Sequence, residues 1–176
     1  MEKDNVIHVS FGSNIRADEF YEKAVILNDM GDVDAAMKLY ERAIEMNPKH
    51  AKALINMGTI CIKQNNEHRA EKCYYKALKI NPKSIAALYN IGYILYPRNT
   101  YIAMTFFERV IDICPKYLDA VYMMGLCLHD VNDEKKACVY WKRYVDNTTK
   151  NDEYRDAALR HAALRHIKTF EQFNSK

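Results

Sequence analysis

Histidine and cysteine are the side chains in this sequence best suited to catalysis or metal binding. The six histidines include no pair at i,i+4, and neither an HExxH sequence nor a glycine-rich phosphate loop is present. Cys127 and His129 lie two residues apart on a predicted helix, where two such side chains point to different sides. The five cysteines form no CxxC pair, so closely spaced zinc ligands are missing. We therefore expect no enzyme activity, no bound metal and no cofactor.

Composition and charge exclude further classes of function. An odd count of five cysteines cannot be fully paired as disulfides, which indicates reduced thiols in a cytoplasmic protein. The sequence contains no run of about 18 or more apolar residues, so we expect no membrane insertion. The net charge is +3, and the basic residues alternate with acidic ones instead of forming one stripe, which argues against nucleic-acid binding.

A repeat runs through most of the chain. Pro48, Pro82 and Pro115 are spaced by 34 and then 33 residues. Fixed intervals upstream of each proline lead to small or aromatic residues, namely Ala43, Ala77 and Val110, then Tyr40, Tyr74 and Phe107, then Ala36, Ala70 and Ala103. A fourth copy lacks the proline but keeps Gly125, Leu128, Ala137 and Trp141. The spacing of apolar residues by three and four predicts two helices in each unit.

Between the two helices of each unit stands an Asp or Asn that is suited to cap the second helix: Asp32, Asn66, Asn99 and Asp133. The shorter third copy lacks a residue just before Asn99, where Tyr96-Pro97-Arg98 replaces the usual linker, so we expect a tightened or distorted turn there. Gly58 and Gly92 are expected to let the first helix approach an alanine of the second. The aromatic residue of each second helix is expected to fill the gap toward the adjacent repeat.

These units resemble the tetratricopeptide repeat, a helix–turn–helix of 34 residues. The resemblance implies an all-α, right-handed solenoid with four repeats over residues 17–150: 17–50, 51–84, 85–117 and 118–150. Tyr144 and Thr149 depart from the repeat pattern, which indicates that the fourth repeat meets something other than a fifth. The segment 151–176 has apolar residues at helical spacing and predicts a C-terminal capping helix; an amphipathic docking helix is the alternative. His161 and His166 are expected on the solvent side of that helix.

Residues 1–16 lie outside the repeat pattern. The stretch Val6–Phe11 alternates weakly, as a strand does, and Gly12-Ser13-Asn14 indicates a break. This segment is expected to be disordered, or else to dock in the groove of the array or swap into another copy.

In the family that the repeats resemble, the first helix of each unit lines a concave groove. The resemblance implies that ten residues face this groove and bind a peptide: Tyr21, Ile55, Asn56, Tyr89, Asn90, Tyr93, Tyr96, Tyr122, Met123 and Leu126. Tyr89, Tyr93 and Tyr122 are expected to form one aromatic wall, because tyrosine buries a large ring and keeps a polar end. The amides of Asn56 and Asn90 could bond to an extended peptide, or could simply be exposed polar groups.

A second family use, capture of a chaperone's C-terminal carboxylate, is not expected. Its clamp requires lysines and an arginine at groove positions, and only an asparagine matches when the pattern is started from either the first or the second repeat. The sequence therefore predicts a non-catalytic scaffold for protein–protein interaction that binds an apolar or aromatic peptide or helix. A homo-oligomerising structural module or assembly factor, and a regulatory module of a larger complex, are the alternatives. The identity of the partner is not encoded in any motif.

Overall fold

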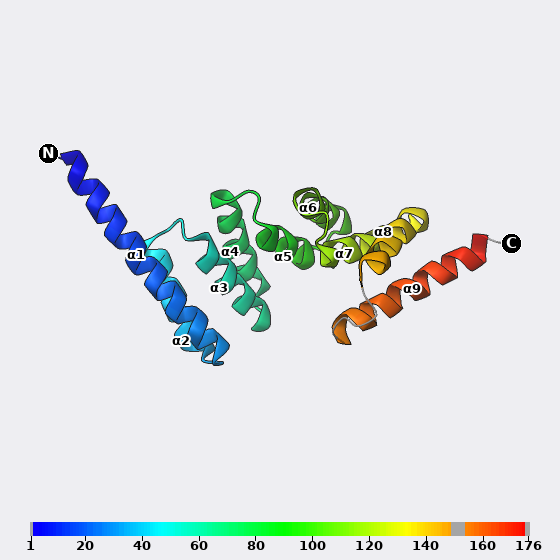
Figure 1. Ribbon diagram of the computed structural model, residues 1–176, viewed down its shortest axis with the longest axis horizontal. Coiled ribbons are helices and arrows are strands. Elements are labelled where there is room, and N and C mark those ends of the chain that lie inside the picture. The colour runs from blue at the N-terminus through cyan, green and yellow to red at the C-terminus, as the bar shows by residue number, and fades with distance from the viewer. Residues whose placement is uncertain (1, 149–153, 175–176) are drawn as a thin grey trace. The chain divides into compact units, whose positions relative to one another are not determined.

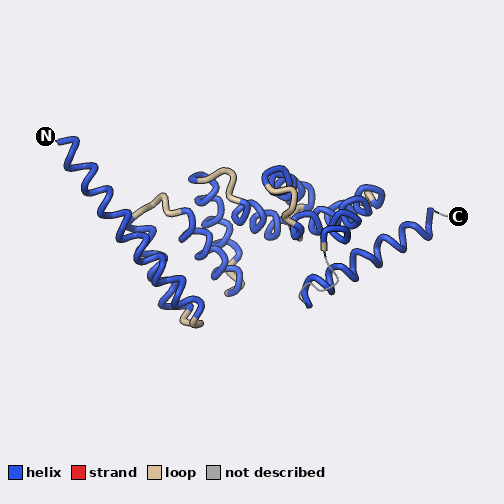
Figure 2. Tube along the Cα trace, viewed as in Figure 1, coloured by secondary structure: helices blue, strands red, loops and turns tan. Residues whose placement is uncertain are grey.

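The computed structural model describes residues 2–148 and 154–174, with side chains for 14–148 and 159–173. Within these residues the chain forms nine α-helices and no strand (Figures 1 and 2). It divides into two compact units, Met1–Ala87 and Leu88–Lys176. The expectation of an all-α fold built from helical repeats is thereby confirmed.

The first unit consists of two helix pairs. Helix α1 (Glu2–Asp29) packs on α2 (Val33–Met46), α2 packs on α3 (Ala51–Lys63), and α3 packs on α4 (Glu67–Ile80) (Figure 1). The break expected at Gly12-Ser13-Asn14 does not occur, because α1 is one helix of 28 residues that includes these positions and the weakly alternating stretch Val6–Phe11. A few alternating residues are a weak signal, whereas elongation of an existing helix avoids the cost of nucleation.

The second unit continues with α5 (Ile85–Leu95), of which the residues from Leu88 belong to this unit, and α6 (Thr100–Ile113). Helix α7 (Leu118–Asp130) packs on α6 and on α8 (Glu134–Asn147). Helix α9 (Tyr154–Asn174) then packs on α8, with Ala163 and Ile167 buried. Thr149 and the expected boundary after residue 150 lie outside the described residues.

The expected helix caps form at all four linkers between paired helices. The side chains of Asp32, Asn66, Asn99 and Asp133 each accept a bond from a backbone N–H of the following helix, at 3.1–3.2 Å. Each cap thereby satisfies an amide that has no partner within its helix. The prediction of these caps is confirmed.

The shortened third linker differs from the others, as its sequence predicts. In the second repeat, Asn65 is left-handed with φ 57°, and the Asn66 N–H reaches back five residues to the Cys61 carbonyl at 2.8 Å. This is the Schellman ending of a helix, which requires one residue in the left-handed conformation. In the third repeat the Asn99 N–H bonds to the Leu95 carbonyl, four residues back, at 2.7 Å. The missing residue is therefore the left-handed one, and the turn is tightened.

The recurring spacing of glycine and aromatic residues has a direct packing cause. A Cβ atom added at Gly58 would lie 2.7 Å from the Tyr74 ring, and one at Gly125 would lie 2.2 Å from the Trp141 indole nitrogen. The aromatic ring thus lies on the glycine of its own helix pair. This contact with the glycine was not expected from the sequence. The expectation that the aromatic ring reaches the adjacent repeat agrees with Tyr40, whose hydroxyl accepts a hydrogen bond from the Asn56 amide of the second repeat.

His50 caps α3 and links it to α1. Its Nδ1 accepts from the Ala53 N–H at 3.1 Å, so its Nε2 carries the proton and donates to Asp18 Oδ1, also at 3.1 Å. The side chain is buried, with a residue exposure of 7%.

Replacing His50 with alanine is expected to lower the free energy of unfolding by about 1–2 kcal/mol, because the cap is lost. The control is His50→Asn, which can still cap the helix but cannot reach Asp18, and it should cost less. Urea unfolding followed by circular dichroism measures both. Equal losses in the two variants would show that the Asp18 contact, and not the cap, stabilises this junction.

Candidate functional site

The three groove residues expected in the first unit lie near the junction of α1, α2 and α3. The Tyr21 ring packs against the rings of His50 and Tyr40, with centroids 4.9 and 5.9 Å away. The Asn56 amide donates to the Tyr40 hydroxyl at 3.1 Å. Ile55 is half-buried. Tyr21 and Asn56 therefore hold neighbouring helices together, and the Asn56 amide already has a partner.

Tyrosines of the second unit form a more accessible group. Tyr89 stacks on Tyr93 with ring centroids 6.4 Å apart, and it packs on Tyr117 at 5.4 Å and on Phe107 at 5.8 Å. Tyr93 is 53% exposed, whereas Phe107 is fully buried. We call Tyr89, Tyr93 and Tyr117 the tyrosine cluster. It joins α5 to the residue that precedes α7; Tyr89 and Tyr117 are half-buried, and Tyr93 is its exposed member.

Tyr117 is absent from the predicted groove set because it lies just before α7, outside the helix whose positions the repeat pattern assigns. Its place two residues after Pro115, where the chain turns into the next first helix, is the signal that could have identified it.

Residues expected on α7 lie deeper than the groove assignment implies. Tyr122 and Met123 are buried, with exposures of 8% and 7%, and the Tyr122 ring packs on Tyr144 with centroids 5.2 Å apart. Leu126 and Asn90 are half-buried. Tyr122 therefore contributes to the core of its helix pair, so removing its ring should also destabilise the fold.

Tyr96 has a structural partner. Its hydroxyl donates to Asp130 Oδ2 at 2.6 Å, which ties the end of α5 to the end of α7. Burial, together with the Asp130 carboxylate, raises the pKa of Tyr96, so the phenol remains a hydrogen-bond donor at neutral pH. Tyr96 therefore acts as a brace between two helices.

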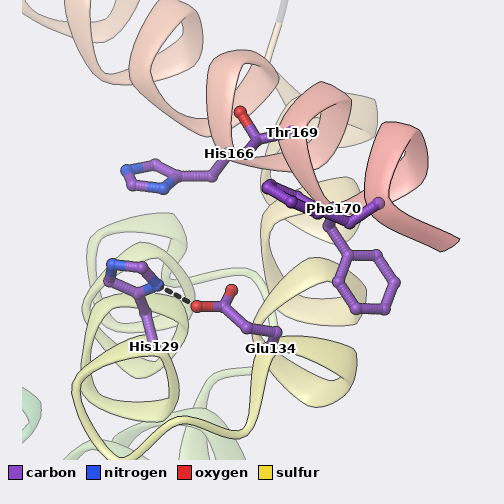
Figure 3. A pocket seen from close by; sticks show the side chains of 6 residues that line it. His129, Glu134, His166, Thr169 and Phe170 are labelled. Carbon is purple, nitrogen blue, oxygen red and sulfur yellow. Dashed lines mark hydrogen bonds and ion pairs between the residues drawn. The ribbon is translucent and has the colours of Figure 1, made fainter.

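A second feature of this unit is a pocket between α9 and the α7–α8 pair (Figure 3). It has a volume of about 390 Å³ and is lined by His129, Glu134, His166, Thr169, Phe170 and Phe173. His129 Nδ1 bonds to Glu134 Oε1 at 2.5 Å, and the His129 and His166 rings lie 4.9 Å apart.

His166 was expected on the solvent side of its helix, and that expectation is wrong. Its ring stacks on the buried Trp141 indole, with centroids 4.3 Å apart. Burial and the neighbouring His129 lower the pKa of His166, which favours the neutral ring in this contact. The signal was available in the spacing, because His166 follows the buried Ala163 by three residues and so shares its face.

The buried thiols have the environment of structural cysteines. Cys61, Cys73, Cys127 and Cys138 are all buried. Burial raises the pKa of each, and that of Cys127 to about 12, so the reactive thiolate is disfavoured. Among the residues that the structure describes, no three His, Cys, Asp or Glu side chains are grouped in a way that could hold a metal ion. In the same part of the chain, no helix is long and apolar enough to cross a membrane.

The paired helices, their capped turns and the rings packed on glycine define a tetratricopeptide-like repeat protein. Residues 24–165 match the family described as the cilia and flagella-associated protein 70 middle TPR-like domain, and the chain belongs to this family. No curated protein matches the chain in sequence.

Solved structures agree on the fold. pilF of Pseudomonas aeruginosa superposes with a TM-score of 0.75 and 19% identity, covering 90% of this chain and 70% of its own. YrrB, a TPR protein with an unusual peptide-binding site, gives 0.68 and 15%, covering 85% of this chain and 76% of its own. The MamA protein gives 0.67 and 19%, covering 87% and 88%. At these identities the likeness shows the fold alone.

Proposed function

We propose that the protein is a non-catalytic interaction scaffold, and that the tyrosine cluster of the second unit binds an apolar or aromatic segment of a protein partner. The observation that carries this proposal is the exposure of Tyr93, at 53%, beside rings that hold it in place. A rigid aromatic ring with a polar end is the usual anchor of a protein interface. The peptide-binding site named for YrrB, a protein of the same fold, is consistent with this role.

The family name directs the search for the partner. It associates the related domain with cilia and flagella, so ciliary or flagellar proteins are the first candidates for binding. A cytoplasmic location remains the prediction from the cysteine content. Oligomerisation is a separate prediction, and light scattering over a range of concentrations tests it.

Replacing Tyr93 with alanine is expected to weaken partner binding by about 2 kcal/mol, or roughly thirtyfold, because an exposed anchor ring is lost. The free energy of unfolding should change by less than about 0.5 kcal/mol, since more than half of the ring's residue surface is already in water. The matched control is Tyr101→Ala, which removes another tyrosine of the second unit that is 69% exposed but is not one of the three cluster residues.

Partners captured from a ciliary extract by the wild type and by Tyr101→Ala, but not by Tyr93→Ala, would support the proposal. Their affinities are then measured with the purified partner by calorimetry. Equal affinity for all three proteins would move the binding site away from the tyrosine cluster.

A further inference from the structure

The α1–α2 pair carries a hollow lined by two apolar and four charged side chains. The hollow has a volume of about 400 Å³ and is lined by Arg16, Glu19, Phe20 and Lys23 of α1 and by Arg42 and Met46 of α2. The α1 residues recur at three- and four-residue intervals, so they share one face of that helix. Phe20 and Met46 are half-buried, whereas the charged residues are exposed. We call these six residues the α1–α2 hollow.

The equivalent face is covered in a later repeat of the same unit. Counting 34 residues from Phe20 and Lys23 leads to Leu54 and Met57 on α3, which are only 3% and 6% exposed, and α2 packs on α3.

In the second unit, Val121 and Met124 on α7 hold the same repeat positions. They are 0% and 4% exposed, and α6 packs on α7. In both units, therefore, the second helix of one repeat packs on the first helix of the next repeat, and the corresponding positions of that first helix are apolar and buried. In α1 the corresponding residues are Phe20, which is only half-buried, and Lys23, which is exposed to solvent within the described residues.

Charge indicates which kind of helix fits the α1–α2 hollow. Its lining contains three cations, Arg16, Lys23 and Arg42, and one carboxylate, Glu19. Arg42 also pairs with Glu45 at 2.9 Å, but both side chains are more than 60% exposed, so this pair is weak and can exchange. The rim is positive although residues 1–50 contain 6 basic and 10 acidic residues, a net charge of −4.

A charged surface also helps an uncovered repeat to remain soluble. Solubility alone, however, requires no apolar floor, and here Phe20 and Met46 are partly open to solvent between the cations. An apolar floor inside a positive rim fits apolar side chains flanked by carboxylates.

We propose that the α1–α2 hollow docks an amphipathic, acidic helix of a protein partner. The apolar side chains of that helix contact Phe20 and Met46, and its carboxylates pair with Arg16, Lys23 and Arg42. This surface belongs to the first unit and is distinct from the tyrosine cluster, so the two sites can engage different segments.

The test uses the full chain and two synthetic helical peptides. One has leucines along one face, flanked by glutamates, and the other carries lysine in place of every glutamate. Fluorescence anisotropy should show that the glutamate peptide binds at least tenfold more tightly than the lysine peptide. Its affinity should fall with added salt, because the paired charges are exposed to solvent.

Variants then locate the site. The double charge reversal Arg16→Glu/Lys23→Glu, at exposed positions, should weaken binding of the glutamate peptide at least tenfold. The matched control is Lys76→Glu on α4, which reverses an exposed lysine that holds the repeat position of Arg42. This control and Tyr93→Ala should each retain the affinity of the wild type.

Three results would overturn the proposal: no binding of the glutamate peptide at millimolar concentration, equal binding of both peptides, or undiminished binding by the double charge reversal. Loss of glutamate-peptide binding in Tyr93→Ala would also overturn it, because the peptide would then occupy the tyrosine cluster. Failure here leaves the proposed function of that cluster unaffected, since its own test uses a different partner and different variants.

Discussion

Replacing Gly125 with alanine should lower the free energy of unfolding by about 3 kcal/mol, the upper part of the range for overpacked cores. The new Cβ would lie 2.2 Å from Trp141 Nε1 and 2.5 Å from Cδ1, far inside van der Waals contact. The Trp141 ring is fully buried and stacks on His166, so it has little room to move away. Alanine is the better helix former by about 1 kcal/mol, but the clash outweighs that gain.

A double-mutant cycle separates packing from other causes. On a Trp141→Ala background the ring is absent, so Gly125→Ala should cost nothing and could even stabilise the helix. Gly58→Ala offers a comparison, because its Cβ would lie 2.7 Å from a Tyr74 ring carbon and should cost less. Urea unfolding of the variants gives each free energy. An equal cost of Gly125→Ala with and without the Trp141 ring would contradict this account of the packing.

Placing a charge in the contact between α8 and α9 is the second large perturbation. Ile167→Asp is expected to cost about 3 kcal/mol, because Ile167 is 6% exposed and an unpaired carboxylate would be removed from water. Next to it, His166 stacks on Trp141, and Lys142 of α8 pairs with Glu171 at 2.7 Å. The same substitution at Phe173, which is 79% exposed, is the control and should change stability little.

Ending the chain at residue 148 tests the same contact without a new charge. The shortened protein should aggregate or lose stability, since the Trp141 face of α8 would become exposed. If this protein were monomeric and as stable as the wild type, and Ile167→Asp were harmless, α9 would be a docking helix for a partner instead of a cap.

Much of the fold could be predicted from the spacing of a few residues. Three signals carried the prediction: the regular spacing of the prolines, the small residues, and the Asp or Asn before each second helix. Each of them acts locally or between neighbouring helices. A helix cap depends on a side chain and an amide three residues away, so its presence can be inferred from the residue type alone. The tightened turn before Asn99 was predictable for the same reason, because a missing residue leaves no position for the left-handed conformation.

The candidate site was less predictable, because exposure depends on what packs against each side chain. Tyr93 and Tyr122 both belong to the predicted wall, yet one is 53% exposed and the other 8%. The difference arises from Tyr144 of the following helix, which packs on the Tyr122 ring. Tyr117 belongs to the tyrosine cluster although it lies before α7, outside the helical pattern of the sequence. The Asn56 amide, which was expected to be able to bind a peptide, donates a hydrogen bond to Tyr40.

The period, the paired helices, their caps and the class of repeat could all be inferred from the amino-acid sequence, since each follows from local chemistry repeated along the chain. The folded chain was needed to see which ring lies on which glycine, that His166 stacks on Trp141, and that the α1–α2 hollow remains open. These features depend on contacts between residues of different helices, and the same apolar spacing is compatible with a buried face or an open one. Whether a side chain is buried depends on the residues that pack against it from other helices, and the sequence of a single helix does not specify those residues.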